Sequence, residues 1–468
     1  MKKAIQSLEE VRKTSADFSI NAEMFTPDIV ELRKKLRSNG YKPLAEFAKY
    51  IKRGSQPEYS TDGTIKALRS VNIRENGFSN DRQEFVTEDF YNKNPRMHIF
   101  KGDVLLNSTG VGTLGRCCFV FNNEKFVIDG HITRISKLEE LSPEFLYVYL
   151  NSKYGQLQIN KLYKGSSGQI EIYPEQIQLI YIKPLKMQKL ISNLVQLSYQ
   201  YREKCIQYYK EANSYLKNEL TLNSEHLSHK LWFVKNYSDV KDANRFDAEY
   251  FQLKYDEIIE KINKYPKGWD IIGNQFDQNK NSFLIDINSE YKYVEIGSIN
   301  IANGEIIPEN IQGKNLPANA KINLQQDDIL ISKVRTYRGA VAIVKSIDYV
   351  GSGAFTVLHE KINSKINKET LYVYFKLKPI LDLTLKYNTG SSYPTITDED
   401  ILNIPIPIFK QEIQNLVKNN IQQAQKIQSQ SKRLLEIAKR GVEIAIEQDE
   451  DIATNWINQE LQKIGVEL

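Results

Sequence analysis

The chain has little of what disulfide frameworks, zinc sites and membrane spans require. Its 468 residues include three cysteines, too few for a disulfide framework, and no Cys/His spacing resembles a zinc site. No apolar run approaches the ~18 residues that a membrane-spanning helix needs. Lys2 and Lys3 are not followed by the apolar segment of a secretory signal. We therefore expect a cytoplasmic protein that does not bind membranes.

Motifs for catalysis are also missing. The sequence contains no G-x-x-x-x-G-K-[ST] phosphate loop, and Gly110-Val111-Gly112 matches the dinucleotide-binding pattern only in part. It has no Asn/Asp-Pro-Pro-aromatic tetrapeptide of the adenine methyltransferases and no nuclease-like spacing of acidic residues and lysine. His226 and His229 have no third ligand near them, so a solvated linker is the favoured interpretation. The sequence predicts a chain that is not an enzyme and holds no metal.

Composition places the chain among globular proteins and leaves its partners open. Hydrophobic residues make up 41% of the sequence and charged residues 26%, as in ordinary soluble domains. The net charge of +5 is modest, so charge alone supports DNA binding only weakly.

The most informative feature present is an internal repeat with a period of about 225 residues. Matching segments follow the same order in both halves: residues 22–25 with 248–251, 70–73 with 298–301, 103–106 with 328–331, 146–150 with 371–375, and 165–167 with 390–392. A period this long indicates two copies of a whole domain. It predicts pseudo-two-fold symmetry, which suits a target with two similar parts.

Each copy mixes helices and strands, so the fold class is α+β. Short β-branched runs such as Val104-Leu105-Leu106 and Ile329-Leu330-Ile331 predict buried strands, and the Cys117-Cys118 pair lies in another apolar strand. Ser142-Pro143 is typical of a helix start, and Thr397 with Asp400 predicts a capped short helix. The prolines within 404–408 indicate an edge or terminal strand.

A long helix is predicted after each copy, at residues 186–222 and 409–447. Apolar residues recur there in steps of three and four for about four heptads, with occasional polar positions that would fix register. The predicted seam consists of Ile191, Leu194, Tyr201, Tyr208, Tyr215, Ile413, Val417, Ala424, Ile427 and Leu434. One interpretation is that each helix is an ordinary amphipathic helix that packs on its own domain. Because both are ~50 Å long and equivalently placed, we favour an antiparallel two-stranded coiled coil.

These patterns divide the chain into six segments. They are a first α+β domain (1–185), a first spacer helix (186–222), a linker (223–245), a second α+β domain (246–408), a second spacer helix (409–447) and a C-terminal tail (448–468); the resemblance described below implies that both domains are target-recognition domains.

Polar loops at equivalent places differ between the two copies. Amide, hydroxyl and basic side chains can bond phosphates and base edges, and arginine can bind guanine through two hydrogen bonds. A Gly/Ser turn can also be only a turn, but the same framework carrying different polar residues twice indicates two readers of different sequences. The predicted DNA-binding residues are Asn107, Ser108, Thr109, Thr113, Arg116, Lys164, Ser166, Ser167, Gln169, Lys333, Arg335, Thr336, Tyr337, Arg338, Ser391, Ser392 and Tyr393.

Over nearly its whole length the chain resembles the specificity subunit of a Type I restriction–modification system. The resemblance is carried by residues 103–106 with Gly115, by the 165–167 turn leading to 182–185, and by their repeats at 328–331, 339, 390–392 and 404–407. One departure is the first turn, where Gly168-Gln169-Ile170-Glu171 stands in place of Tyr393-Pro394.

The resemblance implies a non-catalytic subunit that reads a bipartite double-stranded DNA site, one half with each domain. The implied partners are two modification (methyltransferase) subunits and two restriction (translocase and nuclease) subunits. S-adenosylmethionine, ATP and Mg²⁺ would be bound by those partners, which methylate adenine and cleave DNA, and this chain would bind no cofactor.

Three other functions stay open on the sequence alone. The chain could serve a related phage-defence methyltransferase that has no restriction partner. It could be a coiled-coil adaptor that binds only proteins. An independent nuclease or methyltransferase is the least supported, because its motifs are missing.

Overall fold

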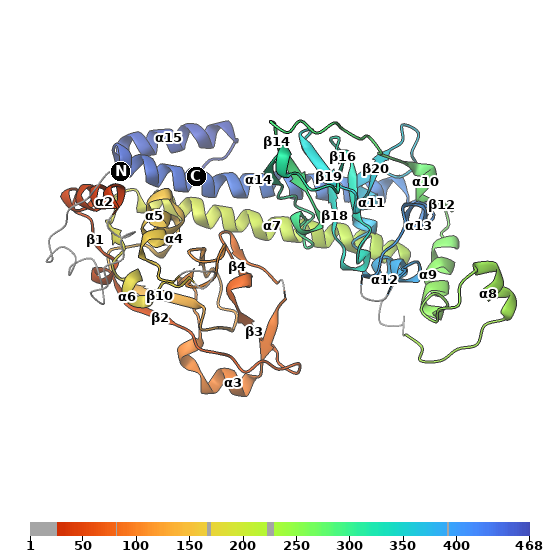
Figure 1. Cartoon of the computed structure of the whole chain (residues 1–468), viewed down its shortest axis with the longest axis horizontal. Coiled ribbons are helices and arrows are strands. Elements are labelled where there is room, and N and C mark those ends of the chain that lie inside the picture. The colour runs from red at the N-terminus through yellow and green to blue at the C-terminus, as the bar shows by residue number, and fades with distance from the viewer. Residues whose placement is uncertain (1–25, 81, 166–169, 222–228, 391–392) are drawn as a thin grey trace. The chain divides into compact units, whose positions relative to one another are not determined.

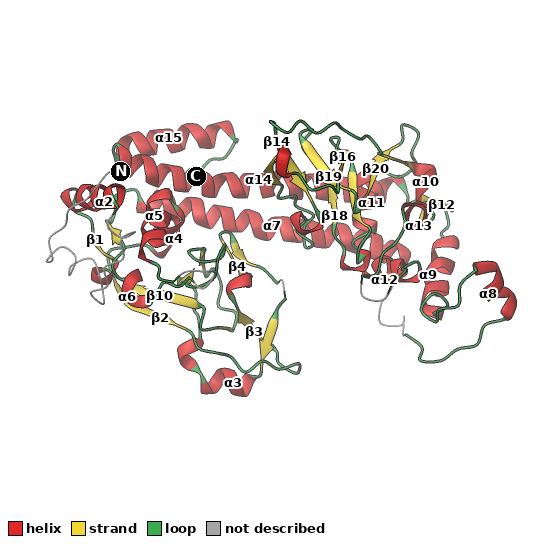
Figure 2. Cartoon of the chain, in the orientation of Figure 1, coloured by secondary structure: helices red, strands yellow, loops and turns green. Residues whose placement is uncertain are grey.

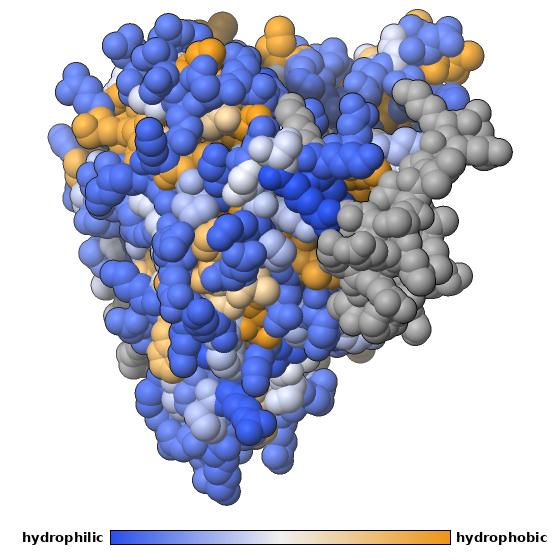
Figure 3. All heavy atoms as spheres, turned by 90° about the vertical axis from the view of Figure 1, so that its left-hand side faces the viewer, coloured by the Kyte–Doolittle hydropathy of each residue, from blue (hydrophilic) through white to orange (hydrophobic). Residues whose placement is uncertain are grey.

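The computed structural model describes residues 26–80, 82–165, 170–221, 229–390 and 393–468. The chain divides into two compact units, the first made of residues 1–202 and 428–468 and the second of residues 203–427. Each contains both helices and sheets (Figures 1 and 2). No helix of the described residues is long and apolar enough to cross a membrane, and the face of the molecule in Figure 3 is mostly hydrophilic.

In the described residues of the first unit, helix α2 is followed by a series of short strands interrupted by α3, and then by three consecutive helices. Its helices are α2 (Pro27–Ser38), α3 (Glu88–Lys93), α4 (Pro143–Asn151), α5 (Lys153–Leu162), α6 (Pro174–Ile177) and α15 (Glu450–Lys463). Its strands are β1 (Lys42–Pro43), β2 (Ala48–Arg53), β3 (Ile65–Leu68), β4 (Ile73–Arg74), β5 (Gly77–Phe78), β6 (Glu84–Val86), β7 (Val104–Asn107), β8 (Cys117–Phe119), β9 (Phe126–Ile128), β10 (Ile132–Leu138) and β11 (Tyr181–Ile182).

The second unit repeats this plan. Its helices are α8 (Tyr237–Ala243), α9 (Leu253–Asn263), α10 (Ile272–Gln275), α11 (Lys368–Tyr374), α12 (Lys378–Lys386) and α13 (Asp398–Leu402). Its strands are β12 (Trp269–Ile271), β13 (Phe276–Gln278), β14 (Glu290–Val294), β15 (Glu309–Gln312), β16 (Ala320–Asn323), β17 (Ile329–Ser332), β18 (Val341–Ile343), β19 (Tyr349–Ser352), β20 (Phe355–Glu360) and β21 (Pro405–Pro407). Two long helices, α7 (Gln188–Leu220) and α14 (Gln411–Glu447), each contribute to both units.

The order of the strands in the central sheet is the same in both units, which shows that the units are two copies of one fold. The central sheet is β2-β10-β7-β8 in the first unit and β13-β20-β17-β18 in the second, antiparallel throughout. A second sheet is built around the parallel pair β3/β9 in one unit and β14/β19 in the other. A two-stranded sheet, β1/β11 or β12/β21, completes each unit. The predicted α+β fold with two domains of one kind is confirmed.

The repeated sequence motifs are explained by the fold. Tyr149 of α4 donates its hydroxyl to the carbonyl of Tyr181, 2.6 Å away, and Tyr374 of α11 donates to the carbonyl of Pro405 at the same distance. Both tyrosines are fully buried, and a buried hydroxyl needs such a partner. The Leu-Tyr-Val-Tyr repeat therefore ties each helix to the small sheet.

The repeated aspartate has a structural role as well. Asp103, just before β7, accepts a bond from the amide of Phe100 at 2.8 Å, and Asp328, just before β17, accepts one from the amide of Gln325 at 2.8 Å. Each side chain closes the turn that starts a buried strand. Burial raises the pKa of Asp103, since it disfavours the charged form.

The predicted helix starts and buried strands are confirmed. Ser142 caps α4 by accepting from the amide of Phe145 at 3.1 Å. Thr397 and Asp400 form the reciprocal cap of α13, with both backbone-to-side-chain bonds 3.1 Å long. The two adjacent cysteines are fully buried in β8, where burial raises the pKa of both thiols.

The long helices pair in antiparallel fashion within each unit. In the first unit, Ser198 of α7 and Ser431 of α14 are buried and each donates to the other's carbonyl, at 2.9 and 2.8 Å. In the second, the amide of Asn420 lies 3.4 Å from the carboxylate of Glu211. The buried serine pair fixes the register of an otherwise apolar seam. The predicted pairing of the helices is confirmed.

The structure places the seam slightly differently from its predicted residues. Ile191, Leu194, Val417, Ala424 and Leu434 are fully buried. The remaining predicted residues are half-buried at the edge of the seam: Tyr201, Tyr208, Tyr215, Ile413 and Ile427. Their buried neighbours take the centre, among them Val195, Tyr209, Leu216 and Ile421. The side chains of the three tyrosines among them are long enough to lie at the edge of the seam and still cover the core.

The segment assigned to a C-terminal tail forms α15, which packs along α14 in the first unit (Figure 1). Gly441 allows the close approach: a Cβ there would lie 2.5 Å from Cδ1 of Ile457, which is fully buried. A glycine inside a helix lowers stability by ~1 kcal/mol relative to alanine. The close contact with α15 that this glycine permits offsets the loss.

We expect Gly441→Ala to lower the stability of the first unit by up to ~2 kcal/mol, because overpacking costs ~1–3 kcal/mol and the higher helix propensity of alanine offsets ~1 kcal/mol of it. Ile457→Val removes the atom that the new methyl would strike. The double variant should therefore be more stable than the two single effects added together, as a double-mutant cycle would measure. Strictly additive effects would contradict the contact.

Candidate nucleic-acid interface

In the first unit, a loop and a turn meet beside the end of β7. The loop spans residues 107–116 and the turn precedes α6. Thr109 and Glu171 form a β-bridge. The amide of Ile172 donates to the carbonyl of Ser108 at 2.9 Å, and the amide of Gly110 donates to the carbonyl of Ile170 at 3.1 Å. The fold therefore brings together two polar segments that are some fifty residues apart in the sequence.

The second unit builds the same framework. Val334 and Thr395 form the equivalent bridge, and the amide of Ile396 donates to the carbonyl of Lys333 at 3.0 Å. The amide of Arg335 donates to the carbonyl of Pro394 at 2.8 Å. Each unit thus presents one loop–turn edge, which we call the reading edge: residues 107–116 with 164–165 and 170–173 in the first unit, and 332–340 with 388–390 and 393–396 in the second.

Three of the predicted DNA-binding residues are buried in their reading edges. Asn107 donates to the carbonyl of Ser70 at 2.9 Å, and the hydroxyl of Ser108 lies 2.6 Å from that of Thr133. Thr336 donates to the carbonyl of Ser332 at 2.6 Å. Side chains held this way fix the shape of the loops, so we assign them to the scaffold and not to contact with DNA.

Other predicted residues of the first edge are accessible. Thr109 is half-buried and its hydroxyl lies 2.9 Å from Nδ1 of His131, while Thr113 donates to the carbonyl of Thr109 at 2.8 Å. Lys164 is half-buried on the turn. Val111, at the tip of the loop, is 68% exposed. These groups surround a loop whose tip is open to a ligand.

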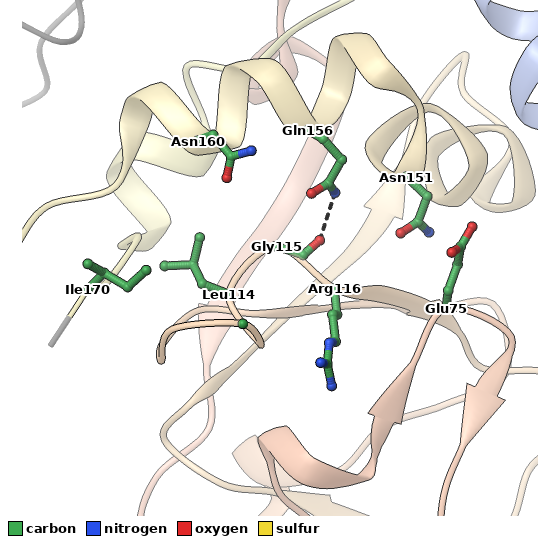
Figure 4. Close-up of a pocket in the computed structure, with 9 residues that line it drawn as sticks. Glu75, Leu114, Gly115, Arg116, Asn151, Gln156, Asn160 and Ile170 are labelled. Atoms are coloured by element: carbon green, nitrogen blue, oxygen red, sulfur yellow. Dashed lines mark hydrogen bonds between the residues drawn. The ribbon is translucent and has the colours of Figure 1, made fainter. Parts of the chain in front are cut away.

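Arg116 lies near a second guanidinium, that of Arg74. Burial lowers the pKa of Arg116, and the positive charge of Arg74 lowers it further. Two neighbouring cations favour an anion between or beside them, as a DNA phosphate would provide. Arg116 also lines a cavity of ≈470 Å³ together with Glu75, Asn151, Gln156 and Asn160 (Figure 4).

The second edge offers larger cationic and aromatic groups. Arg335 adopts a left-handed backbone conformation (φ 50°), and its guanidinium stacks 5.0 Å from the ring centre of Tyr393, which is 70% exposed. Arg338 is exposed and Tyr337 half-buried. A stacked arginine keeps its N–H groups at the ring's rim, where they can reach a phosphate or a base edge.

Lys333 is held by an acidic residue of α13. Its ammonium lies 3.2 Å from the carboxylate of Asp398, which also accepts a bond from the hydroxyl of Thr356 at 2.6 Å. This lysine is 23% exposed, so its charge is partly neutralised within the edge.

Five predicted residues lie outside the described part of the chain: Ser166, Ser167, Gln169, Ser391 and Ser392.

One important residue of the first edge escaped the sequence analysis. Arg53, at the end of β2, donates to the carbonyls of Ser108 (3.3 Å) and Ile172 (2.9 Å), and so ties the loop to the turn. It also lies 3.3 Å from Glu171 and 4.6 Å from the ring centre of Tyr173. A hydrogen bond from Tyr173 and the charge of Arg53 lower the pKa of Glu171.

No local motif marks Arg53, because its partners are more than fifty residues away. The strand pairing could have been inferred only from the repeat, in which β2 corresponds to β13. Within the described residues, no group of three or more His, Cys, Asp or Glu side chains could hold a metal ion.

The comparisons with known proteins agree with this architecture. Residues 38–197 match the family model described as the Type I restriction modification DNA specificity domain. No curated protein matches the chain.

Two solved structures are similar over most of their length. The S subunit of a Type I restriction–modification system from M. genitalium is 13% identical, with 92% of this chain and 96% of that chain covered and a TM-score of 0.36. The HsdS subunit from Thermoanaerobacter tengcongensis is 14% identical, with 87% and 96% covered and a TM-score of 0.27.

The family match thus covers residues 38–197, which lie in the first unit, and the central sheet of the second unit repeats the strand order of that in the first.

Proposed function

We propose that the chain reads a bipartite double-stranded DNA site, one half with each reading edge, and directs partner subunits to it. The observation that supports this best is the same loop–turn framework in both units with different residues on it: Thr109, Thr113 and Arg116 on one, Arg335, Tyr337 and Arg338 on the other. A shared scaffold with different polar groups is what two readers of different sequences require.

The proposed partners are two modification subunits, which bring S-adenosylmethionine and methylate adenine, and two restriction subunits, which bring ATP-driven translocation and Mg²⁺-dependent cleavage. This chain is proposed to act in the cytoplasm as the non-catalytic subunit of that complex and to bind no cofactor of its own. A complex without restriction subunits would methylate the site and leave it uncut, so the genes beside this one distinguish the two assemblies.

Binding of duplex DNA tests the proposal against an adaptor that binds only proteins. The chain with its methyltransferase subunit should shift a random-sequence duplex in a gel, and the affinity should fall steeply with salt, because phosphate contacts release counterions. No shift at low salt would contradict DNA binding.

The stacked and exposed arginines of the second edge give a sharper test. Arg335→Ala with Arg338→Ala should weaken specific binding, since each base-contacting arginine is worth ~1–3 kcal/mol, and should relax only the half-site read by the second unit. If both residues bind phosphates, affinity should fall for all sequences alike and the salt dependence should lessen. Lys267→Ala, on an exposed turn away from the edge, serves as the control. Unchanged affinity in the double variant would remove this loop from the interface.

A further inference from the structure

In both reading edges the loop ends at a glycine with a left-handed backbone. Gly115 has a φ of +84° and Gly339 a φ of +77°, a region that other residues adopt only with strain. Gly115 directly precedes Arg116 of the first edge, and Gly339 directly follows Arg338 of the second. The position of the glycine therefore sets the backbone from which that arginine extends.

The carbonyl of each glycine accepts a side-chain hydrogen bond from a helical segment. In the first unit, Nε2 of Gln156 in α5 donates to the carbonyl of Gly115 at 2.9 Å (Figure 4). The same nitrogen donates to the carbonyl of Leu150 at 2.8 Å, which fixes the side chain to its own helical region. The loop end is thus joined to the buried core through one carboxamide.

In the second unit a lysine makes the corresponding link. Nζ of Lys376, between α11 and α12, donates to the carbonyl of Gly339 at 2.7 Å and to the carbonyl of Ile301 at 2.9 Å. Burial lowers the pKa of Lys376 to about 7. A neutral amine still carries two N–H donors, one for each carbonyl, so the link does not require the charged form.

The two links are not copies of one sequence position. In the repeat, Lys376 corresponds to Asn151, five residues before Gln156. Asn151 instead donates to the carbonyls of Cys117, at 3.2 Å, and Tyr147, at 3.0 Å. Different residues at different positions therefore reach the same loop carbonyl, which indicates that this carbonyl has to be held.

We infer that Gln156 and Lys376 are positioning residues that fix the reading loop of their own unit and thereby its half-site specificity. They act through the glycine carbonyl and the adjacent arginine and do not touch DNA themselves. The inference deepens the proposed function and rests on it for specificity, while the anchoring of the loop can be tested without DNA.

The first measurement is hydrogen–deuterium exchange on the full chain. Lys376→Met removes the donors and keeps an unbranched side chain as far as Cε, whereas Lys376→Gln has the same reach and carries two N–H donors. Amide exchange in residues 333–341 should quicken about tenfold in the methionine variant, as expected from the net value of such a bond, and should return towards wild type in the glutamine variant. Exchange in residues 108–117 should not change. Gln156→Met should give the opposite pattern.

The second measurement is selection of binding sites from a random duplex library by the chain with its methyltransferase subunit. Lys376→Met should relax the half-site of the second unit alone, Gln156→Met that of the first alone, and Lys376→Gln neither. Unchanged loop exchange in the methionine variants, or equal weakening of both half-sites, would overturn the inference. If the wild-type chain selects no sequence, the proposed DNA function fails, and the exchange data still decide whether the two residues anchor the loops.

Discussion

Replacing residues 1–185 with the first domain of another Type I specificity subunit is expected to change one half of the methylated DNA motif and leave the other half unchanged. Each unit has its own central sheet and its own reading edge, and the edge is held by contacts within that unit, such as Arg53 with Ser108 and Ile172. Exchange of one domain therefore replaces one set of base contacts completely.

The reciprocal exchange of residues 246–408 is the matched experiment and should change only the other half. Both chimaeras retain α7 and α14, so the gap between the half-sites should stay the same. Motifs would be read from the methylated bases in cells that carry the chimaera and the methyltransferase subunit. If either exchange altered both halves together, the two units could not be independent readers.

Lengthening the paired helices is expected to lengthen the gap between the half-sites. α7 has 33 residues and α14 has 37, and each contributes one part to each unit. Four residues inserted between Arg202 and Glu203, with four more between Ile427 and Gln428, keep the pairing inside each unit. The insertion adds ~6 Å at 1.5 Å per residue. Because one base pair occupies ~3.4 Å along the duplex, the gap should grow by one or two base pairs, and the lower figure allows for fraying.

The control places the same four residues in the linker near Lys235, outside both long helices. It should leave the motif as it was. Both half-sites should also keep their sequences in the helix variant, because no reading edge has moved relative to its own unit. An active helix variant with an unchanged gap would show that something else sets the spacing.

The sequence was sufficient for the architecture because the determining signals are local and occur twice. The period of the repeat, the caps at Ser142 and Thr397, and the apolar steps of the two long segments each predict one feature without knowledge of the fold. Residues 448–468 were assigned to a tail although Asp449 caps α15 by accepting from the amide of Ile452; the packing of α15 on α14, by contrast, depends on a distant residue, Gly441.

The reading edges show where such reasoning stops. Polar residues next to a strand were taken as DNA contacts, yet Asn107, Ser108 and Thr336 are buried and bond the loop to the scaffold. Side-chain type does not reveal whether a polar group turns inward or outward. Arg53 and Lys376 reach the edges from distant segments, so no local motif marks either residue.

The most direct test of the account is a genome-wide map of methylated adenines in cells that carry this chain with its methyltransferase subunit. We expect a single bipartite motif, with two short specified segments separated by a fixed gap of unspecified bases. The double substitution of Arg335 and Arg338 by alanine should then degrade one segment only. A contiguous motif, or methylation with no sequence preference, would contradict the claim that each unit reads its own half of the site.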